Sequence, residues 1–363
     1  MRPELKFLLV LILVVASLIA KSESVKCTSL KNVFLMVHHR YGDPFNITSF
    51  SGCIERLAFN NKSLTEIYIR NQNVTDINTD TVRHMVRLKT ILFYECPVQS
   101  ISVGAFRNVP LLQNIQISYG NLTEIPAEVF NRAPALQLLR LNDNKIAKIE
   151  EEAFGGLENL KRIYMAKNEL KVWKISWFVR TTNLEIIDFQ KNKIEIIPRR
   201  AFYGMNKLKE LYFDYNEVKT IETKAFEGIQ QLDYLGLRYN RLTKIDGKVF
   251  PKKMSIESLF IDANYLNYLS DDVFSRLSVL EVTLDLNPWK CACLNIIHSR
   301  LRNAGTNLKI NELCARSDIP TCVYSFNNSE NCTENVDKQL TKSYIDTLKN
   351  VRISLDKSCA RLD

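Results

Sequence analysis

The chain has 363 residues, of which 46% are hydrophobic and 25% charged, and its formal net charge is +9. This composition is typical of a folded globular protein and excludes a mainly disordered chain. Lysine and arginine alternate with acidic residues along the sequence instead of forming basic runs, so the positive charge does not indicate nucleic-acid binding.

The first 22 residues have the pattern of a secretory signal peptide. Arg2 and Lys6 precede an apolar run from Phe7 to Ala20. This run is shorter than the roughly 20 residues that a helix needs to span a bilayer. We therefore expect cleavage near Ser22 and a secreted protein without a membrane anchor.

Glycosylation signals and cysteines also favour an extracellular protein. Asn-x-Ser/Thr sequons predict glycosylation at Asn46, Asn61, Asn73, Asn121, Asn327 and Asn331. Eight of the nine cysteines lie near the chain ends, at Cys27, Cys53, Cys291, Cys293, Cys314, Cys322, Cys332 and Cys359. We expect a Cys27–Cys53 bridge in an N-terminal cap and further bridges in a C-terminal cap, where six cysteines permit fifteen pairings. Cys359 could instead bridge two chains, so both a monomer and a disulfide-linked dimer stay open.

A 24-residue repeat organises the middle of the chain. The pattern is L-x-x-L-x-L-x-x-N-x-L-x-x-I. Its ten copies open at Leu64, Leu88, Leu112, Leu136, Leu160, Leu184, Leu208, Leu232, Ile256 and Val279. The nineteenth position holds phenylalanine in repeats two to nine, at Phe106, Phe130, Phe154, Phe178, Phe202, Phe226, Phe250 and Phe274. The ninth position holds asparagine in repeats four to ten, at Asn144, Asn168, Asn192, Asn216, Asn240, Asn264 and Asn287.

Each repeat should supply one strand, because apolar and polar residues alternate around its second and third leucines. A single repeat cannot bury its apolar side alone, so neighbouring repeats should stack into a continuous parallel sheet. We expect the phenylalanines to pack on the convex side and the asparagine amides to bond backbone groups of adjacent turns. Gln72, Cys96 and Gly120 replace asparagine in repeats one to three, which predicts less regular turns there. We interpret Cys96 as a buried structural thiol rather than a reactive or interchain cysteine.

The repeats, together with the segment from Asn287 to Cys293, resemble the extracellular leucine-rich-repeat family. The resemblance implies an α/β repeat solenoid, a horseshoe with a curved parallel sheet on its concave face and disulfide-stapled caps. The expected layout is a signal peptide (1–22), an N-terminal cap (23–63), ten repeats (64–287) and a C-terminal cap (288–363). The resemblance also implies that Cys291 bonds Cys314 and that Cys293 bonds a later cysteine.

The overall plan is similar to that of the mosquito leucine-rich immune proteins, but without their long C-terminal coiled coil. That likeness implies humoral recognition, or scaffolding of complement-like factors. Leu340, Tyr344, Leu348, Val351 and Leu355 follow an amphipathic helical spacing. This stretch covers barely two heptads, so we expect a helix docked on the cap rather than a dimer zipper.

Partner binding is expected at positions three, five, seven and eight of each repeat, which should point from the concave face to solvent. The candidates, rich in the residue types that interfaces favour, are Tyr68, Tyr94, Tyr119, Arg140, Tyr164, Asp188, Tyr212, Asp214, Tyr215, Tyr234, Arg238 and Tyr239. The six from Tyr212 to Tyr239 form the favoured cluster, with Tyr215 and Tyr239 expected to face solvent. The alternative is that these tyrosines simply stabilise the sheet by cross-strand stacking.

Catalysis, cofactors and metals have little support in the sequence. The four histidines, His38, His39, His84 and His298, belong to no recognisable nucleophile or metal motif. The sequence therefore predicts a secreted recognition protein whose concave face binds an extracellular protein or glycan. The alternative is a soluble receptor ligand, decoy or cell-adhesion factor in Toll-like or neuronal signalling.

Overall fold

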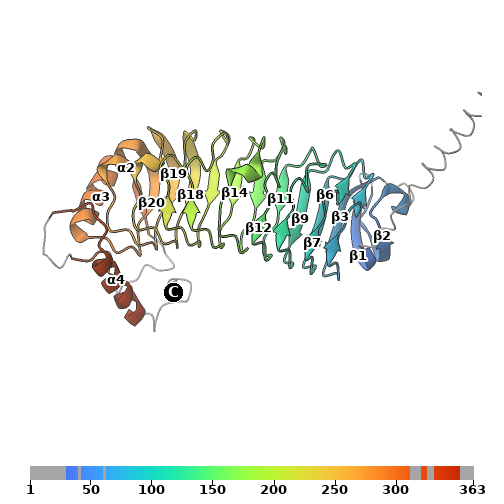
Figure 1. Cartoon of the computed structure of the whole chain (residues 1–363), viewed down its shortest axis with the longest axis horizontal. Coiled ribbons are helices and arrows are strands. Elements are labelled where there is room, and N and C mark those ends of the chain that lie inside the picture. The colour runs from blue at the N-terminus through green and yellow to red at the C-terminus, as the bar shows by residue number, and fades with distance from the viewer. Residues whose placement is uncertain (1–29, 40–41, 60–62, 311–319, 325–330, 352–363) are drawn as a thin grey trace, which may run out of the picture.

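One sheet runs along the whole molecule. The computed structural model describes residues 30–39, 42–59, 63–310, 320–324 and 331–351. Figure 1 shows an elongated body in which the strands stand side by side along the long axis. Among the described residues this sheet has 13 strands, in the order β2-β1-β3-β6-β9-β11-β13-β14-β16-β18-β19-β20-β21. The predicted fold class, a leucine-rich-repeat solenoid with a curved parallel sheet, is confirmed.

Ten of the parallel strands, β3 to β20, each begin near the opening residue of a repeat, and the next one, β21, lies in the C-terminal cap. They are β3 (Leu64–Arg70), β6 (Thr90–Tyr94), β9 (Asn114–Ser118), β11 (Leu138–Arg140), β13 (Arg162–Tyr164), β14 (Ile186–Asp188), β16 (Glu210–Tyr212), β18 (Gln231–Gly236), β19 (Met254–Phe260), β20 (Leu277–Thr283) and β21 (Asn307–Lys309). From β3 to β19, paired residues are 24 apart in sequence, as in Leu139 with Ile163. The repeat length thus equals the distance along the chain between neighbouring strands.

The side opposite the long sheet carries shorter elements. Two-residue strands pair there as β4 (Asp76–Ile77) with β7 (Ser100–Ile101), β5 (Val82–Arg83) with β8 (Phe106–Arg107), β10 (Glu124–Ile125) with β12 (Lys148–Ile149) and β15 (Ile196–Ile197) with β17 (Thr220–Ile221). Three 3-10 turns (Arg56–Phe59, Ile175–Phe178 and Gly247–Val249) and the short helix α2 (Asp271–Arg276) complete the described returning segments. Leucine, isoleucine and valine from both sides fill one continuous core.

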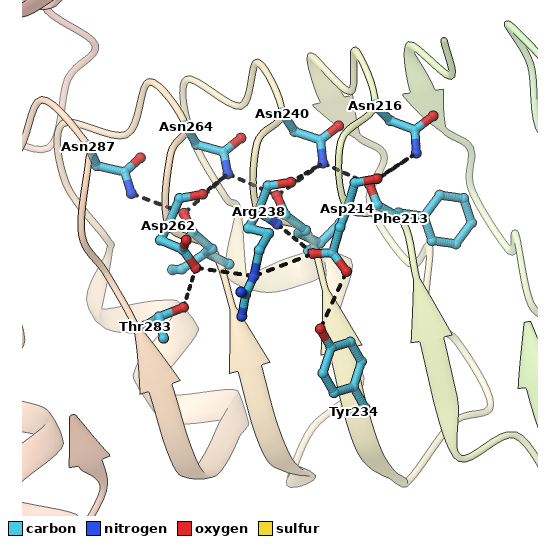
Figure 2. Close-up of polar contacts among 12 residues, drawn as sticks. Phe213, Asp214, Asn216, Tyr234, Arg238, Asn240, Asp262, Asn264, Thr283 and Asn287 are labelled. Carbon is cyan, nitrogen blue, oxygen red and sulfur yellow. Dashed lines mark hydrogen bonds and ion pairs between the residues drawn. The ribbon is translucent and has the colours of Figure 1, made fainter. Parts of the chain in front are cut away.

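The ninth-position asparagines form a ladder of hydrogen bonds along the molecule, as predicted. Asn216 accepts a bond from the backbone N–H of Ile194 at 3.0 Å and donates to the carbonyls of Phe189 and Phe213 at 2.9 and 3.1 Å. Equivalent bonds recur at the other six asparagines. Figure 2 shows the part of the ladder from Asn216 to Asn287. The asparagine ladder therefore pairs buried backbone groups that no neighbouring strand reaches.

The first three repeats replace this ladder in different ways. The Gln72 amide oxygen accepts a bond from the Phe34 N–H at 2.8 Å, which ties repeat one to the N-terminal cap. Cys96 is free and buried, with its sulfur 3.6 Å from the carbonyl oxygens of Ile69 and Tyr94. At Gly120 an added Cβ would lie 2.9 Å from the Cys96 carbonyl oxygen, so a side chain is excluded.

The residue before each ladder position has a left-handed backbone. This conformation occurs in every repeat, with φ between 53° and 58°, at Asn71, Glu95, Tyr119, Asp143, Lys167, Lys191, Tyr215, Tyr239, Ala263 and Leu286. We call these ten residues the rim row, because they lie where the strands end. Non-glycine residues adopt this conformation at an energetic cost, which the asparagine bonds help to offset in repeats four to ten.

The nineteenth-position phenylalanines stack along the side opposite the sheet. Phe106, Phe130, Phe154 and Phe178 follow one another with centroid distances of 5.2 to 6.3 Å. The indole of Trp173 then lies between Phe178 and Phe202, 5.4 and 5.2 Å from their centroids. Its Nε1 donates to the Ala201 carbonyl at 2.9 Å. Trp173 stands where most repeats have isoleucine, and the repeat pattern did not predict that it bridges the phenylalanine column.

The N-terminal end of the sheet is covered by an antiparallel hairpin. β1 (Leu30–His39) pairs with β2 (Phe45–Gly52) on one side and with β3 on the other. It thereby satisfies the edge of the first repeat, which would otherwise be open. Cys53 is disulfide-bonded. Cys27, its predicted partner, lies outside the described residues.

The C-terminal disulfides correct one expectation. Cys291 bonds Cys322, and Cys293 bonds Cys332. The expected Cys291–Cys314 bridge is therefore wrong, although Cys293 does bond a later cysteine. The backbone of Lys290, just before helix α3 (Cys291–Asn303), forms an isolated parallel β-bridge with Val323. This pairing brings Cys322 next to Cys291. Cys314 and Cys359 lie outside the described residues.

Helix α4 (Lys338–Val351) follows the second bridge and lies below α3 and the C-terminal end of the sheet in Figure 1. Leu340, Tyr344 and Leu348 are buried, as the amphipathic spacing predicted. The fifth position of that spacing, Leu355, lies outside the described residues. None of the helices in the described ranges is long and apolar enough to cross a membrane.

Candidate protein-binding surface

Aromatic and charged side chains gather on the sheet between repeats seven and nine. Strands β16, β18 and β19 and the turns that follow them carry Tyr212, Asp214, Tyr234, Arg238, Phe260 and Asp262. We call these six residues the acidic–aromatic surface. Four of them belong to the cluster predicted from the sequence.

Two carboxylates flank one guanidinium at the centre of this surface. Nε of Arg238 lies 3.8 Å from Oδ1 of Asp214 and 3.6 Å from Oδ1 of Asp262 (Figure 2). The Arg238 guanidinium also lies over the Phe260 ring, 4.0 Å from its centroid. Asp214 accepts further bonds from the Arg238 N–H at 3.0 Å and the Tyr234 hydroxyl at 3.4 Å, and the Thr283 hydroxyl donates to Asp262. The three charged groups occupy position seven of three successive repeats.

Gly236 makes this arrangement possible. A Cβ added there would lie 2.1 Å from Oδ2 of Asp214, so only glycine leaves room for the carboxylate. The position is the fifth of its repeat, where other repeats carry Tyr164, Tyr212 or Phe260. A glycine between the aromatic fifth positions of the two adjacent repeats, Tyr212 and Phe260, was the available sequence signal, and the prediction overlooked it.

Burial changes the acid–base properties of the surface. Asp214 and Asp262 are 3% and 0% exposed. Burial raises the pKa of Asp214 to about 7, and the charge of Arg238 acts in the opposite direction. Burial also raises the pKa of Tyr234 and of Tyr212, so both phenols stay neutral donors. The structure thus buries carboxylates that we had expected to face solvent.

The aromatic rings of the surface stack across strands. Tyr212 lies 4.3 Å from Tyr234, and Tyr234 lies 4.8 Å from Phe260, measured between centroids. The Tyr212 hydroxyl donates to Glu210 at 2.6 Å. The alternative considered for these tyrosines, cross-strand stacking, is therefore present. Tyr212, Tyr234 and Phe260 nevertheless stay partly exposed.

The charge of the concave positions changes along the molecule. At positions three, five, seven and eight, repeats one to five hold three acidic and four basic residues, whereas repeats six to ten hold six acidic and two basic ones. The acidic residues of the second group are Asp188, Glu210, Asp214, Asp262, Glu281 and Asp285. Their half of the face has a formal charge of −4, opposite in sign to the +9 of the whole chain.

The predicted residues outside this surface form smaller groups. Tyr94 and Tyr119 contact each other at 4.9 Å between ring centroids, and Arg70 lies 5.8 Å from the Tyr94 ring. Nearby, Tyr68 donates to Glu66. Arg140 lies over Tyr164 at 4.7 Å. The structure therefore divides the candidates between an N-terminal group and the acidic–aromatic surface, with the Arg140–Tyr164 pair between them.

Three candidates are not solvent-facing, contrary to expectation. Tyr239 is 3% exposed because Tyr344 and Leu348 of α4 pack against it, and its ring stacks on the half-buried Tyr215 at 4.3 Å. Asp214 is buried among its partners. Asp188 is 7% exposed and accepts bonds from the backbone and side chain of Gln190. Position within the repeat gave the direction of these side chains but not what covers them.

The sequons leave the acidic–aromatic surface free. Asn46 lies on β2 and is exposed, Asn73 and Asn331 are exposed, and Asn121 is partly exposed. Asn61 and Asn327 fall outside the described residues. No sequon occurs between Asn121 and Asn327 in the sequence, so no glycan would be attached within repeats six to ten. Within the described ranges, no group of three or more His, Cys, Asp or Glu residues could hold a metal ion.

Family models support the repeat assignment. A leucine-rich-repeat model matches residues 159–218 and 182–242, and a BspA-type leucine-rich-repeat model matches residues 52–185 in six copies. The search of curated proteins found no match.

Solved structures share the fold at low sequence identity. One is the chain of an octameric complex of Latrophilin 3, Unc5D and FLRT2 (LRR), with 20% identity and a TM-score of 0.53, covering 76% of this chain and 90% of that one. Another comes from the Drosophila Toll–Spatzle complex, with 19% identity and a TM-score of 0.58, covering 78% of this chain and 42% of that one. Both complexes contain protein partners, and the likeness shows the fold alone.

Proposed function

This chain is a leucine-rich-repeat protein, and from that premise we propose that it is a secreted recognition protein of innate immunity. It binds an extracellular protein partner through the acidic–aromatic surface and performs no catalysis. The signal-peptide pattern, the sequons and the disulfides support secretion. The immune role rests on the likeness to the mosquito leucine-rich immune proteins.

The observation that carries the binding proposal is the composition of repeats seven to nine. Tyr212, Tyr234 and Phe260 present partly exposed rings beside a desolvated charge cluster, and sequons are absent from this stretch. Aromatic residues and arginine at the centre of a surface are typical of the residues that dominate binding energy. A surface that served only the sheet would not need the charge cluster.

The charge of this half of the face indicates the chemistry of the partner. The buried Asp188, Asp214 and Asp262 contribute to that formal charge, so the acidic groups that a partner can reach are the partly exposed Glu210, Glu281 and Asp285. These three carboxylates favour a partner with a basic patch. A lysine or arginine side chain of that partner would pair with Glu210, which lies beside the Tyr212 hydroxyl.

A capture experiment tests this proposal. Tagged protein is incubated in body fluid, and bound proteins are identified for the wild type, for Tyr212→Ala and for Tyr203→Ala. Tyr203 is 59% exposed and lies after Phe202 in the returning segment, so it is a matched control away from the surface. We expect Tyr212→Ala to lose bound partners at least about tenfold, as hot-spot tyrosines do, while Tyr203→Ala retains them. Equal losses would contradict a specific surface.

A second candidate function is a soluble receptor ligand, decoy or adhesion factor. The same scaffold serves such proteins, and the Toll–Spatzle and FLRT2 complexes contain the same fold. The identities of the captured proteins separate the two candidates. Complement-like factors would support humoral immunity, whereas membrane receptors alone would replace it with the second candidate.

A further inference from the structure

Helix α4 covers one end of the rim row. Tyr344 and Leu348 form a small apolar cluster with Tyr239 and Leu286, and Tyr215 and Ala263 pack partly against it. Two members of the rim row, Tyr239 and Leu286, therefore share a cluster with the helix, and two more, Tyr215 and Ala263, lie beside that cluster. Tyr239 and Leu286 are only 3% and 8% exposed as a result. Tyr215 follows Asp214 of the acidic–aromatic surface directly, so α4 borders that surface.

The base of the helix is firmly fixed. Asn267 accepts a bond from the Asp337 N–H at 2.7 Å and donates to the Thr341 hydroxyl at 3.1 Å. Asp337 in turn caps the helix by accepting from the Leu340 N–H at 2.9 Å.

A buried lysine fixes the segment before the helix. The Lys290 ammonium donates to four oxygens of Thr333 and Asn335 at 2.7 to 2.9 Å, and the Cys293–Cys332 bridge lies beside them. The chain entering α4 is therefore covalently and electrostatically held.

The rest of the helix is held by much less. Beyond its first turn, the buried contacts are those of Tyr344 and Leu348, and their cluster is separate from the continuous core of the solenoid. The Tyr344 hydroxyl is buried without a hydrogen-bond partner among the described residues, which costs free energy. Lys342, Asp346, Thr347 and Lys349 face solvent. A 14-residue helix is marginal in water by itself, so undocking would also unwind it.

We propose that α4 is a tethered strap that undocks from the rim row while its base stays fixed, exposing Tyr239 and Leu286. Release extends the Tyr215–Tyr239 stack as an open apolar strip beside the acidic–aromatic surface. An apolar segment of the partner then takes the place of Tyr344 and Leu348. The last step rests on the proposed function, whereas the undocking itself does not.

Hydrogen exchange and tyrosine nitration test the undocking without any partner. In the wild type, we expect the amides of 342–351 to exchange at least about 100-fold faster than the amides of β14 to β18, because local opening needs less free energy than global unfolding. Leu348→Asp should abolish the remaining protection and raise nitration of Tyr239 by tetranitromethane at least about fivefold. Thr347→Asp adds the same charge on the exposed side of the helix and should change neither.

Two outcomes would overturn the strap. One is exchange of α4 at the rate of the ladder amides, which would mean that it opens only on global unfolding. The other is a Leu348→Asp variant whose main melting transition falls while Tyr239 stays unreactive. With a captured partner in hand, Leu348→Asp should also tighten binding. If nitration of Tyr239 rises but affinity for the partner does not, the undocking of α4 is supported. The proposal that the partner binds the exposed rim row is then wrong.

Discussion

At the scale of single residues, the ladder asparagines contribute to the free energy of unfolding because each one pairs buried backbone groups. The Asn216 side chain is 1% exposed and serves three backbone groups from two neighbouring turns. Such a residue acts as a substitute for strand pairing where the chain turns away from the sheet.

Asn216→Ala should therefore lower the free energy of unfolding by roughly 2–4 kcal/mol, because it leaves at least two buried backbone groups unpaired. Urea denaturation followed by circular dichroism measures the change. Asn206→Ala, on an exposed asparagine at the end of the preceding repeat, is the control and should change stability by less than about 0.5 kcal/mol. A loss of similar size in both variants would mean that the ladder bonds contribute little.

Asp214 makes stability depend on pH. Its pKa is about 7 in the folded protein, against an ordinary value of 3.8. Between these values the folded state holds a proton that the unfolded chain has lost, so this group's contribution to stability falls as pH rises through the window. Asp214→Asn removes that dependence and keeps an oxygen that can accept from Arg238.

The melting temperature of Asp214→Asn relative to the wild type should therefore rise between pH 5 and pH 8, as measured by scanning calorimetry at matched ionic strength. A difference that stays constant over this range would show that Asp214 is already ionised in the folded protein at pH 5.

At the scale of elements, the phenylalanine column holds the returning segments against the sheet. Phe202 is fully buried and contacts Trp173, Phe213 and Phe226 at centroid distances of 5.2 to 5.9 Å. Removal of its ring would leave a cavity between two repeats.

Phe202→Ala should cost roughly 3–5 kcal/mol through that cavity. The neighbouring Tyr203→Ala, which removes an exposed ring from the same segment, should cost far less. Thermal melting of both variants provides the comparison, and a small loss at Phe202 would indicate that Trp173 collapses into the space.

Elements that follow the repeat were predictable from the sequence, whereas contacts between distant elements were not. The strands and the ladder follow from local spacing, since every residue of a repeat meets its equivalent in the next one. Trp173 replaces an isoleucine and fills space from another repeat. The packing of α4 on Tyr239 joins residues about 100 positions apart. Neither contact has a periodic signal.

At the scale of the whole molecule, the candidate surface was located only in part from the sequence. Counting positions identified the aromatic residues of repeats seven and eight, but placed Asp214 and Tyr239 in solvent. The position of a residue within the repeat does not show which neighbours will bury it. Asp214 is buried because Gly236 has no side chain, and Tyr239 because α4 covers it. The Cys291–Cys322 disulfide was mispredicted for a similar reason. It depends on how the C-terminal cap folds back to bring Val323 beside Lys290, and cysteine spacing does not show this.

The separation of charge between the two halves of the concave face predicts salt-dependent binding. Raising the salt concentration from about 0.1 M to 1 M shortens the screening length from roughly 10 to 3 Å. We expect capture of a basic partner to weaken markedly over this range, as measured by surface plasmon resonance. The Glu210→Lys variant should show a smaller salt effect than the wild type, and an unchanged one would argue against a basic partner.

Because the repeats are equal in length, the number of repeats sets the distance between any two sites on the sheet. Because neighbouring strands pair residue for residue at an interval of 24, removing residues 136–159 would join two turns that already match in sequence position. The strand pairs, the phenylalanine column and the asparagine ladder would each form again across the junction. The molecule would shorten by one strand spacing, about 4.8 Å. The distance between the two groups of tyrosines is thus set in fixed increments by the number of turns between them.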